Sequence, residues 1–391
     1  MTEVFICAGR RTAIGRHGGA LATLRPDDMA ALVIDGLLDG RDLPVDEVVF
    51  GCANQAGEDN RNVARMAVLL SRLPESVPAL TVNRLCASGL DAVIAGARAI
   101  RDGAAGIVIA GGVESMTRAP FVMAKAEAAW SREAKVFDTT IGWRFAHDRI
   151  AAEFGIESMP ETAENVAAEF AVSRADQDGF ALRSQQRYDA AWHAADILPA
   201  TVRRSRETVT VDRDEHPRAT SAERLAALPA PFRPGGTVTA GNAAGINDGA
   251  AAVLLASAAA AERHGLTPLA RIGAAASAGV APRLMGIGPV AACAKLAART
   301  GIAPADADVI ELNEAFAAQV LACTRAWGLP DDDARVNARG GAIALGHPLG
   351  MSGARIAMTA ARRLAESGGR TAIATLCVGV GQGVALLLHG V

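Results

Sequence analysis

Aromatic residues, lysines and long apolar runs are scarce in this sequence, and each shortage excludes a class of protein. Aromatic residues make up 4% of the 391 residues, whereas half of the chain is hydrophobic. Small aliphatic side chains suit layered helices and sheets better than an aromatic-rich sandwich. Three of the 39 basic residues are lysines, and the 36 arginines are scattered along a chain of net charge −3. No nucleic-acid partner is therefore expected.

Signals for a membrane or for export are also missing. The longest apolar stretch, at 250–261, is well short of the ~20 residues that a membrane span needs. The first residues lack a basic start followed by an apolar signal core. We therefore expect a cytoplasmic protein with no membrane partner.

The six cysteines contain no C-x-x-C pair, so neither a zinc site nor a disulfide framework is predicted, and no metal is expected. Most cysteines in a reducing compartment are small buried hydrophobes. Only local sequence context can therefore single out Cys86 or Cys377 as a chemical group.

Apolar strand patterns alternate with segments of helical spacing, for example a helix at 88–103 before a strand at 106–116. This alternation predicts an α/β fold of parallel sheet units with right-handed crossovers. Residues 118–235 are polar and contain short helical patterns, which indicates an inserted region over one face of the sheet. We expect an N-terminal domain at 1–266, including the insertion, and a C-terminal domain at 267–391.

The second half of the chain repeats the first faintly. Two segments of the first half each match one of the second half in the same order: 46–70 with 307–329, and 85–112 with 349–376. Such pairing predicts a duplicated α/β unit. Cys86 then falls opposite Gly350, and both loop-to-helix junctions lie at the same end of their sheets, where α/β folds usually build their sites.

Cys86 stands directly before a segment of helical spacing. A helix N-terminus offers unpaired N–H groups and a partial positive charge, which lower a cysteine pKa. The small residues that follow let a ligand approach the backbone closely. These residues alone leave open whether Cys86 is a nucleophile or buried filler. The rival nucleophile, Ser88, lacks the G-x-S-x-G frame of a hydrolase elbow.

A nucleophilic thiol needs a base and a place for an oxyanion. The duplication puts the glycine-rich loop of His347 beside Cys86. Cys377 ends a strand before Gly379, and no helix follows, so a dinucleotide-binding interpretation of GVGQG fails. Asn313 stands where a strand meets a helix, and a helix cap is the simpler interpretation there. Two thiols and a histidine can divide one task, with one thiol carrying an acyl group and the other moving a proton.

The sequence resembles the thiolase family of acyl-CoA acetyltransferases through six motifs in matching order: NRLCASGL, GGVESM, TVTAGNAAGINDGAA, NEAFAAQ, GGAIALGHPLGMSGAR and CVGVGQG. The resemblance runs essentially from end to end. It implies the thiolase fold, in which duplicated α/β units form helix-sheet-helix-sheet-helix layers with an inserted loop region.

The resemblance also implies roles for the motif residues. Cys86 matches the acylated nucleophile, and His347 matches the residue that activates it and polarises the thioester oxygen. Cys377 matches the acid/base at the acetyl-CoA α-carbon. Asn313 matches the residue that holds a water in an oxyanion hole beside His347, while the N–H groups of Cys86 and Gly379 match a second hole. Acyl-CoA and CoA are substrates in this family, and no further cofactor is implied.

Other positions match residues that contact CoA. Arg218 matches a residue near the nucleotide, whereas Met159, Met285 and Phe316 match apolar contacts around the pantetheine and thioester. A plain core role is equally open for these three. Ala244 departs from the family pattern, because many relatives carry a serine there that bonds pantetheine.

Within the family, residues 138–145, residues 158–167 and Val380 resemble the β-ketoadipyl-CoA thiolases of aromatic-compound degradation. The implied substrate is 3-oxoadipyl-CoA, cleaved to succinyl-CoA and acetyl-CoA. Its distal carboxylate needs a partner, such as Arg144 or Arg149 of the insertion.

Three alternatives remain open. A general acetoacetyl-CoA thiolase would share every catalytic residue. A non-catalytic acyl-CoA-binding relative is disfavoured because both thiols and the histidine are present. A nicotinamide-dependent oxidoreductase would need a glycine fingerprint near the first strand, which is absent. The resemblance further implies a homodimer or homotetramer.

Overall fold

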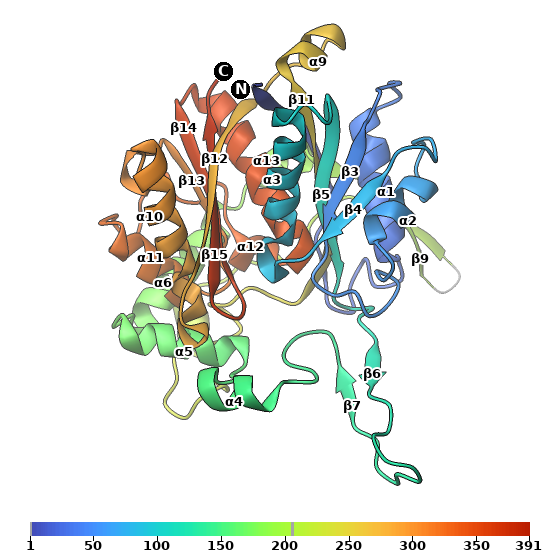
Figure 1. Ribbon diagram of the computed structural model, residues 1–391. Coiled ribbons are helices and arrows are strands. Elements are labelled where there is room, and N and C mark those ends of the chain that lie inside the picture. The colour runs from blue at the N-terminus through green and yellow to red at the C-terminus, as the bar shows by residue number, and fades with distance from the viewer. Residues whose placement is uncertain (1, 205–206) are drawn as a thin grey trace.

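The computed structural model describes residues 2–204 and 207–391, which form a layered α/β fold around a large sheet (Figure 1). The strands of this sheet are β1 (Val4–Thr12), β2 (Gly15–Arg16), β3 (Glu47–Gly51), β4 (Ala79–Val82), β5 (Ile107–Ser115), β8 (Ile197–Leu198), β11 (Asn247–Ser257), β12 (Ala270–Gly279), β13 (Val309–Leu312), β14 (Thr371–Val378) and β15 (Gln382–His389). Two separate hairpins pair β6 (Phe121–Met123) with β7 (Val136–Asp138), and β9 (Ala200–Arg204) with β10 (Glu207–Val211).

The α-helices are α1 (Pro26–Leu38), α2 (Val63–Leu70), α3 (Ser88–Arg101), α4 (Asp148–Phe154), α5 (Met159–Glu169), α6 (Arg174–Arg187), α7 (Ala190–Ala194), α8 (Ala222–Ala226), α9 (Ala258–Arg263), α10 (Gly288–Thr300), α11 (Ala317–Ala326), α12 (Ala342–Leu345) and α13 (Leu349–Ser367). Short 3₁₀ turns are η1 (Leu85–Ala87), η2 (Pro282–Ile287) and η3 (Pro304–Asp306). Local sequence fixes several ends: a capping box of Ser173 and Asp176 starts α6, and left-handed glycines 301 and 368 end α10 and α13. None of the described helices combines the length and the hydropathy that a bilayer-spanning helix requires.

The sheet repeats one strand order twice, which confirms the predicted duplication. Its order is β13-β14-β15-β12-β1-β11-β5-β3-β4. In the first half β3 lies between β4 and β5 and is parallel to both, and in the second half β13 is parallel to β14. Val336 bridges Ile310 of β13 in parallel, where β4 stands in the first half. The two halves join through the antiparallel pairing of β1 with β12.

The expectation of purely parallel units is wrong at the strands that close each half. β11 runs antiparallel to β5 and β1, and β15 runs antiparallel to β14 and β12. Only residues 379–381 join β14 to β15. A parallel pairing needs a crossover of a dozen or more residues, so this short turn forces a hairpin.

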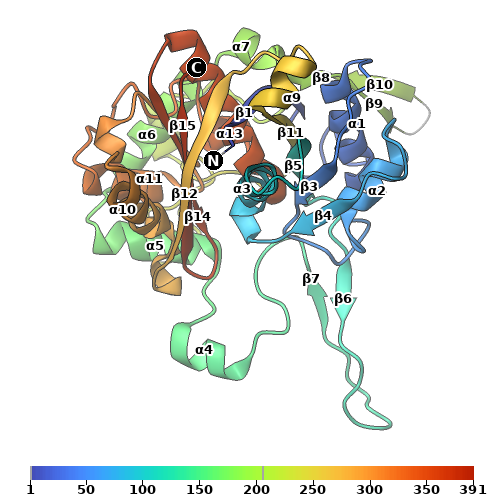
Figure 2. The ribbon, with the colours of Figure 1, turned by 45° about the horizontal axis from the view of Figure 1, so that its top comes forward.

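The three largest apolar cores of the described residues lie between five layers, as the resemblance implied (Figures 1 and 2). Helices α1 and α2 cover the outer face of the first half-sheet, α10 and α11 cover the outer face of the second, and α3 and α13 lie together between the two. The central pair therefore contacts both half-sheets, and its N-terminal ends meet beside the loops that follow β3 and β5.

Glycines allow α3 and α13 to approach closely. A Cβ on Gly89 would overlap the carbonyl oxygen of Gly350, and one on Gly353 would overlap the backbone nitrogen of Leu90. Gly112 of β5 faces Gly350 in the same way. Side chains at these positions would force the helices apart. The glycines thus set how near the residues before α13 lie to those before α3.

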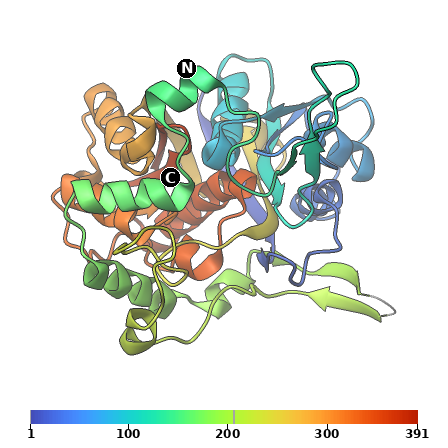
Figure 3. The same ribbon diagram turned by 90° about the horizontal axis from the view of Figure 1, so that it is seen from below.

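The sequence predicted that the inserted region covers one face of the sheet. In the structure this region instead contacts both halves of the molecule. Helices α5 and α6 pack on α11 of the second half, whereas β8 pairs with β1 in the first. Seen from below, the region spreads across both halves (Figure 3). The β6–β7 hairpin projects from the body (Figure 1). Since α11 and β1 lie in different layers, one chain segment covering both must wrap around the molecule.

Candidate active site

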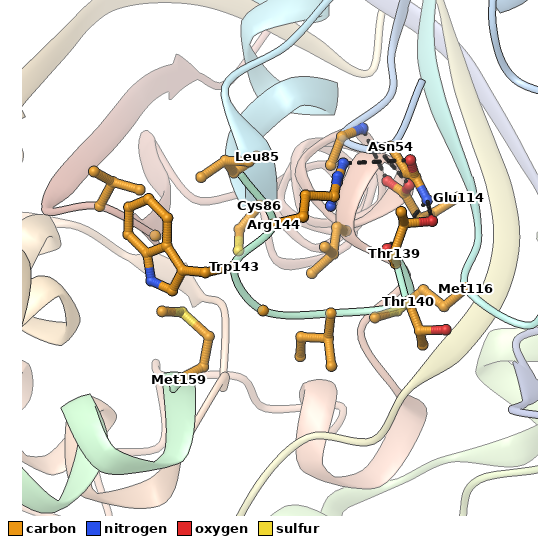
Figure 4. Close-up of a pocket in the computed structure, with 16 residues that line it drawn as sticks. Asn54, Leu85, Cys86, Glu114, Met116, Thr139, Thr140, Trp143, Arg144 and Met159 are labelled. Atoms are coloured by element: carbon orange, nitrogen blue, oxygen red, sulfur yellow. Dashed lines mark hydrogen bonds between the residues drawn. The ribbon is translucent and has the colours of Figure 1, made fainter. Parts of the chain in front are cut away.

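A cavity of about 330 Å³ opens where the N-terminal ends of α3 and α13 meet, and Cys86 lies on its wall (Figure 4). One side is apolar and is formed by Leu85, Trp143, Met159 and Val380. The other side is polar and carries Asn54, Glu114, Thr139 and Arg144. In Figure 4 the Cys86 sulfur lies between these two sides. A ligand in this cavity can therefore meet a thiol, an apolar wall and a charged wall together.

The turn before α3 holds Cys86 in place through an unusual backbone. Leu85 has a positive φ of 46°, which is uncommon for a residue with a side chain and costs conformational energy. Ser88 stabilises the turn, because its Oγ accepts from the Arg84 N–H at 2.9 Å and donates to the Leu85 carbonyl at 2.7 Å. Ser88 is itself buried, so this rival nucleophile has a structural role in the turn.

The predicted lowering of the Cys86 pKa is wrong for the free protein. Burial raises the pKa of this thiol to about 11, and a hydrogen bond from the Gly379 backbone only partly opposes the shift. Desolvation of the thiolate by burial is the largest cause of this shift. This shift favours the neutral thiol in the free protein.

Cys377 is buried close enough to Cys86 for the charges of the two sulfurs to interact. A negative charge on the Cys86 sulfur would raise the pKa of Cys377 further, after burial has raised it well above its usual range. Cys377 packs in one apolar cluster with Met159, Met285 and Phe316. The structure therefore brings together both thiols and three of the residues expected to contact CoA.

The turn between β14 and β15 presents Gly379 to Cys86. The Gly379 backbone is hydrogen bonded to the Cys86 thiol and lies on the cavity wall. Its neighbour Val380 has a positive φ of 62°, a strained conformation for a β-branched side chain. The N–H of Gly379 thus points to the atom at which an acyl group would form.

His347 is buried two residues before α13, whose first residue, Leu349, lines the cavity. The Oγ of Ser352 donates to the Pro348 carbonyl at 2.8 Å and lies 2.6 Å from Nδ1 of His347. When the Ser352 hydroxyl donates to that carbonyl, its Oγ can accept from Nδ1–H of His347, and this tautomer leaves Nε2 as an acceptor. Burial, aided by the charge of Arg355, lowers the pKa of His347 to about 3. The imidazole is thus a neutral base.

Asn313 lies beside that base. Its Nδ2 is 3.4 Å from Nε2 of His347, and its buried Oδ1 has no hydrogen-bond partner among the described residues. An unpaired buried carbonyl calls for a donor such as a water or a ligand group. The helix-cap interpretation of Asn313 is wrong, because α11 begins only at Ala317 after an uncapped Phe316.

The remaining predicted CoA contacts lie outside the cavity wall. The Arg218 side chain donates to the Ala240 carbonyl and the Arg218 backbone donates to Gln185. The backbone of Ala244 donates to the Ala315 carbonyl, directly before Phe316. The cavity and Arg218 are therefore separate places in the free protein, whereas Ala244 adjoins the apolar cluster around Cys377.

Sequence reasoning missed Asn54 and Glu114. The Glu114 carboxylate accepts hydrogen bonds from the backbones of Ala53, Asn54 and Gly350 at 2.8–3.0 Å, and so ties the β3 loop to the start of α13. Burial raises the pKa of Glu114 to about 7. The one available signal was an acidic residue inside the apolar end of a strand, in the motif GGVESM.

Metal-ligand side chains gather behind this wall. Cys52, Asp59 and Glu114 hold buried donor atoms within 4.8 Å of one another. Cys52 donates to the Asn54 carbonyl, Asp59 accepts from the Gly57 N–H, and Glu114 is bonded as above. These contacts account for the cluster as a hydrogen-bonded support of the β3 loop.

Comparison with known proteins agrees with this architecture. Residues 4–259 match the family of the thiolase N-terminal domain, and residues 266–390 match that of the thiolase C-terminal domain. The chain therefore belongs to the thiolase family, whose members are acyltransferases.

Particular relatives are similar over their whole length. The chain is 58% identical to a β-ketoadipyl-CoA thiolase of Pseudomonas putida and 57% identical to a 3-oxoadipyl-CoA/3-oxo-5,6-dehydrosuberyl-CoA thiolase of Escherichia coli K12, with full coverage of all chains. Among solved structures, the acetyl-CoA acetyltransferase of Bacillus anthracis is 38% identical with a TM-score of 0.91, and the human mitochondrial 3-ketoacyl-CoA thiolase is 37% identical with a TM-score of 0.90. Each of these two comparisons covers 100% of this chain and 99% of the other.

Proposed function

We propose that this protein cleaves 3-oxoadipyl-CoA with CoA to give succinyl-CoA and acetyl-CoA, through an acyl group carried on Cys86. The observation that carries the proposal is the proximity of two thiols, Cys86 on the cavity wall and Cys377 buried near it, with His347 two residues before Leu349 of the same wall. The names of the relatives at 57–58% identity support the dicarboxylic substrate.

In the first half-reaction, Nε2 of His347 takes the Cys86 proton while the sulfur bonds to the 3-keto carbon of the substrate. The bond between carbons 2 and 3 then breaks, and its electron pair leaves with acetyl-CoA as an enolate. Cys377 gives its proton to carbon 2 of that enolate and becomes a thiolate. Burial of Cys377 suits this role, because a thiol of raised pKa keeps its proton until a carbanion-like acceptor develops.

In the second half-reaction, the Cys377 thiolate takes the proton of CoA, and the CoA sulfur attacks the thioester carbon on Cys86. Cys86 leaves and recovers its proton from His347. Hydrogen-bond donors stabilise the oxyanions: the N–H groups of Cys86 and Gly379 act in one position, and the O–H of a water held by Asn313 beside His347 acts in the other. CoA and acyl-CoA are substrates, and the residues supply the chemistry with no further cofactor.

The test is CoA-dependent consumption of 3-oxoadipyl-CoA beside acetoacetyl-CoA. Cys86→Ala should lose activity by at least about 10⁴-fold, as expected for removal of a nucleophile. Cys377→Ala should still take up an acyl group from succinyl-CoA on Cys86, seen by intact mass, yet fail to break the carbon–carbon bond. Cys7→Ala is the matched control away from the cavity. Residual activity in Cys86→Ala would refute the mechanism, and equal use of acetoacetyl-CoA would refute the substrate.

We also propose that the enzyme acts as a homodimer or homotetramer in the cytoplasm, with domains at 1–266 and 267–391 and the insertion at 118–235. Exposed apolar side chains support association. Leu80 lies on the edge strand β4, and Trp130, 96% exposed, lies at the tip of the β6–β7 hairpin. All six cysteines are free, which suits a reducing compartment. Sedimentation equilibrium will give the oligomeric state.

A further inference from the structure

The proposed function places a carboxylate inside the cavity. Cleavage of 3-oxoadipyl-CoA leaves a succinyl group on Cys86, and its free carboxylate ends a short chain. A carboxylate taken out of water is costly unless a cation or several donors meet it. Its partner must therefore lie on the same cavity wall as Cys86. This inference rests on the proposed function.

Arg144 is the cationic side chain on that wall. It is half-buried in the loop that follows β7, and it lies on the polar side of the cavity with Asn54 (Figure 4). Its Nη2 is 3.4 Å from Oδ1 of Asn54, and within residues 2–204 and 207–391 no carboxylate oxygen lies within 4.0 Å of its guanidinium. A guanidinium with one long bond to an amide keeps most of its donors for a ligand.

The neighbouring groups leave this role to Arg144. Arg149 pairs with Glu153 on α4 at 2.7 Å and is 78% exposed, outside the cavity wall. The Thr139 hydroxyl donates to the Pro120 carbonyl and so is not free to donate inward. Glu114 shares the wall, but its two oxygens already accept three backbone N–H groups. The apolar side of the cavity has no charged group for a carboxylate.

We infer that Arg144, held by Asn54, binds the distal carboxylate of the acyl chain and sets the preference for dicarboxylic 3-oxoacyl-CoA substrates. The apolar side, with Trp143 and Met159, is then left for the thioester and pantetheine. Cys86 between the two sides receives the acyl carbon. A planar guanidinium can bind a carboxylate through two parallel hydrogen bonds, which an ammonium cannot copy.

The experiment compares 3-oxoadipyl-CoA with 3-oxohexanoyl-CoA, which has the same acyl length without the carboxylate. The readout is the ratio of kcat/KM for the two substrates in the wild type, Arg144→Gln, Arg144→Lys and the control Arg149→Gln. Arg144→Gln should lower the ratio by about 10- to 100-fold, the range expected for lost hydrogen bonds to a charged group. Arg144→Lys should recover part of the loss, and Arg149→Gln should keep the wild-type ratio.

The outcomes separate the inference from the proposed function. A wild type that favours 3-oxoadipyl-CoA, with a ratio that Arg144→Gln leaves intact, overturns the role of Arg144 and spares the function. A wild type without preference for the carboxylate overturns both. A loss in Arg144→Gln that is equal for the two substrates also overturns the inference, because a structural role would not discriminate between them. Loss of the ratio with Arg149→Gln would move the subsite to α4.

Discussion

The turn that leads into α3 and the turn that leads into α13 share the pattern L-x-x-S-G, at 85–89 and 349–353. In both, a serine Oγ donates to a carbonyl one turn back, Ser88 to Leu85 and Ser352 to Pro348. In both, the glycine after the serine packs against the backbone of the other helix. The two junctions are thus built alike and face each other across the centre of the molecule.

They differ at the position after the leucine. The first turn has Cys86 there, reached through a left-handed Leu85, while the second has Gly350, whose carbonyl contacts the glycines of the first half. The second Ser hydroxyl has also gained a histidine partner. In the proposed mechanism, one copy therefore provides the close packing and the base, and the other copy presents the nucleophile.

The largest expected effect comes from a substitution that disrupts the close contact between α3 and α13. Gly353→Ala should cost about 3 kcal/mol of unfolding free energy or more, because its Cβ would overlap the rigid backbone nitrogen of Leu90. The matched control is Gly179→Ala inside α6, where an added Cβ meets nothing within 4 Å. That change should stabilise by about 0.5–1 kcal/mol. Denaturant melts give both values, and a Gly353→Ala protein as stable as the wild type would contradict the close contact.

The second prediction concerns the protonation of Cys86, at the first junction, and of His347, at the second. Burial raises the pKa of Cys86 to about 11 and lowers that of His347 to about 3, so both groups are neutral at pH 7. Below pH 11 the thiolate fraction rises tenfold with each pH unit, so alkylation of Cys86 by iodoacetamide should speed up about 100-fold from pH 7 to pH 9. Peptide mass mapping isolates this cysteine, and Cys86→Ala gives the background. A rate already level at pH 7 would indicate a thiolate–imidazolium pair instead.

The smallest expected effect comes from removing the hydroxyl of Ser352, which contacts His347 at the second junction. Ser352→Ala removes the acceptor for Nδ1–H, so the imidazole can place its proton on Nε2 and lose its ability to take the Cys86 proton. We expect kcat to fall about 10- to 100-fold with little change in KM. Ser352→Thr, which keeps a hydroxyl, should recover much of kcat. Nitrogen NMR of the imidazole reports the tautomer directly, and an unchanged tautomer in Ser352→Ala would contradict this role.

Much of the fold could be predicted, because the duplicated unit is visible as two pairs of similar segments in the sequence. The strand–helix alternation of 85–112 and 349–376 placed α3 and α13 correctly and set Cys86 opposite Gly350. The antiparallel closing strands were missed, since strand patterns carry no direction. The short link from β14 to β15 was the available clue.

The site was harder to predict wherever burial decides the chemistry. The sequence places Cys86 at a helix start, and only the fold reveals that its thiol is desolvated. Asn54, in the loop after β3, and Glu114, near the end of β5, reach the cavity through tertiary packing. Arg144 could be named among candidates, but Arg149 could be set aside only once its partner Glu153 was known.

Val380 stands between two cavities. It lines the cavity of Cys86 and, together with Trp143, also lines a second, apolar cavity that Ile150 and Phe154 complete. Its left-handed φ of 62° costs the chain roughly 1–3 kcal/mol, which a glycine would avoid. The Val380 side chain and that of Trp143 thus lie between the two cavities. For enzyme engineering, Val380→Gly is accordingly expected to relieve the backbone strain and to widen the passage between the two cavities beside Trp143.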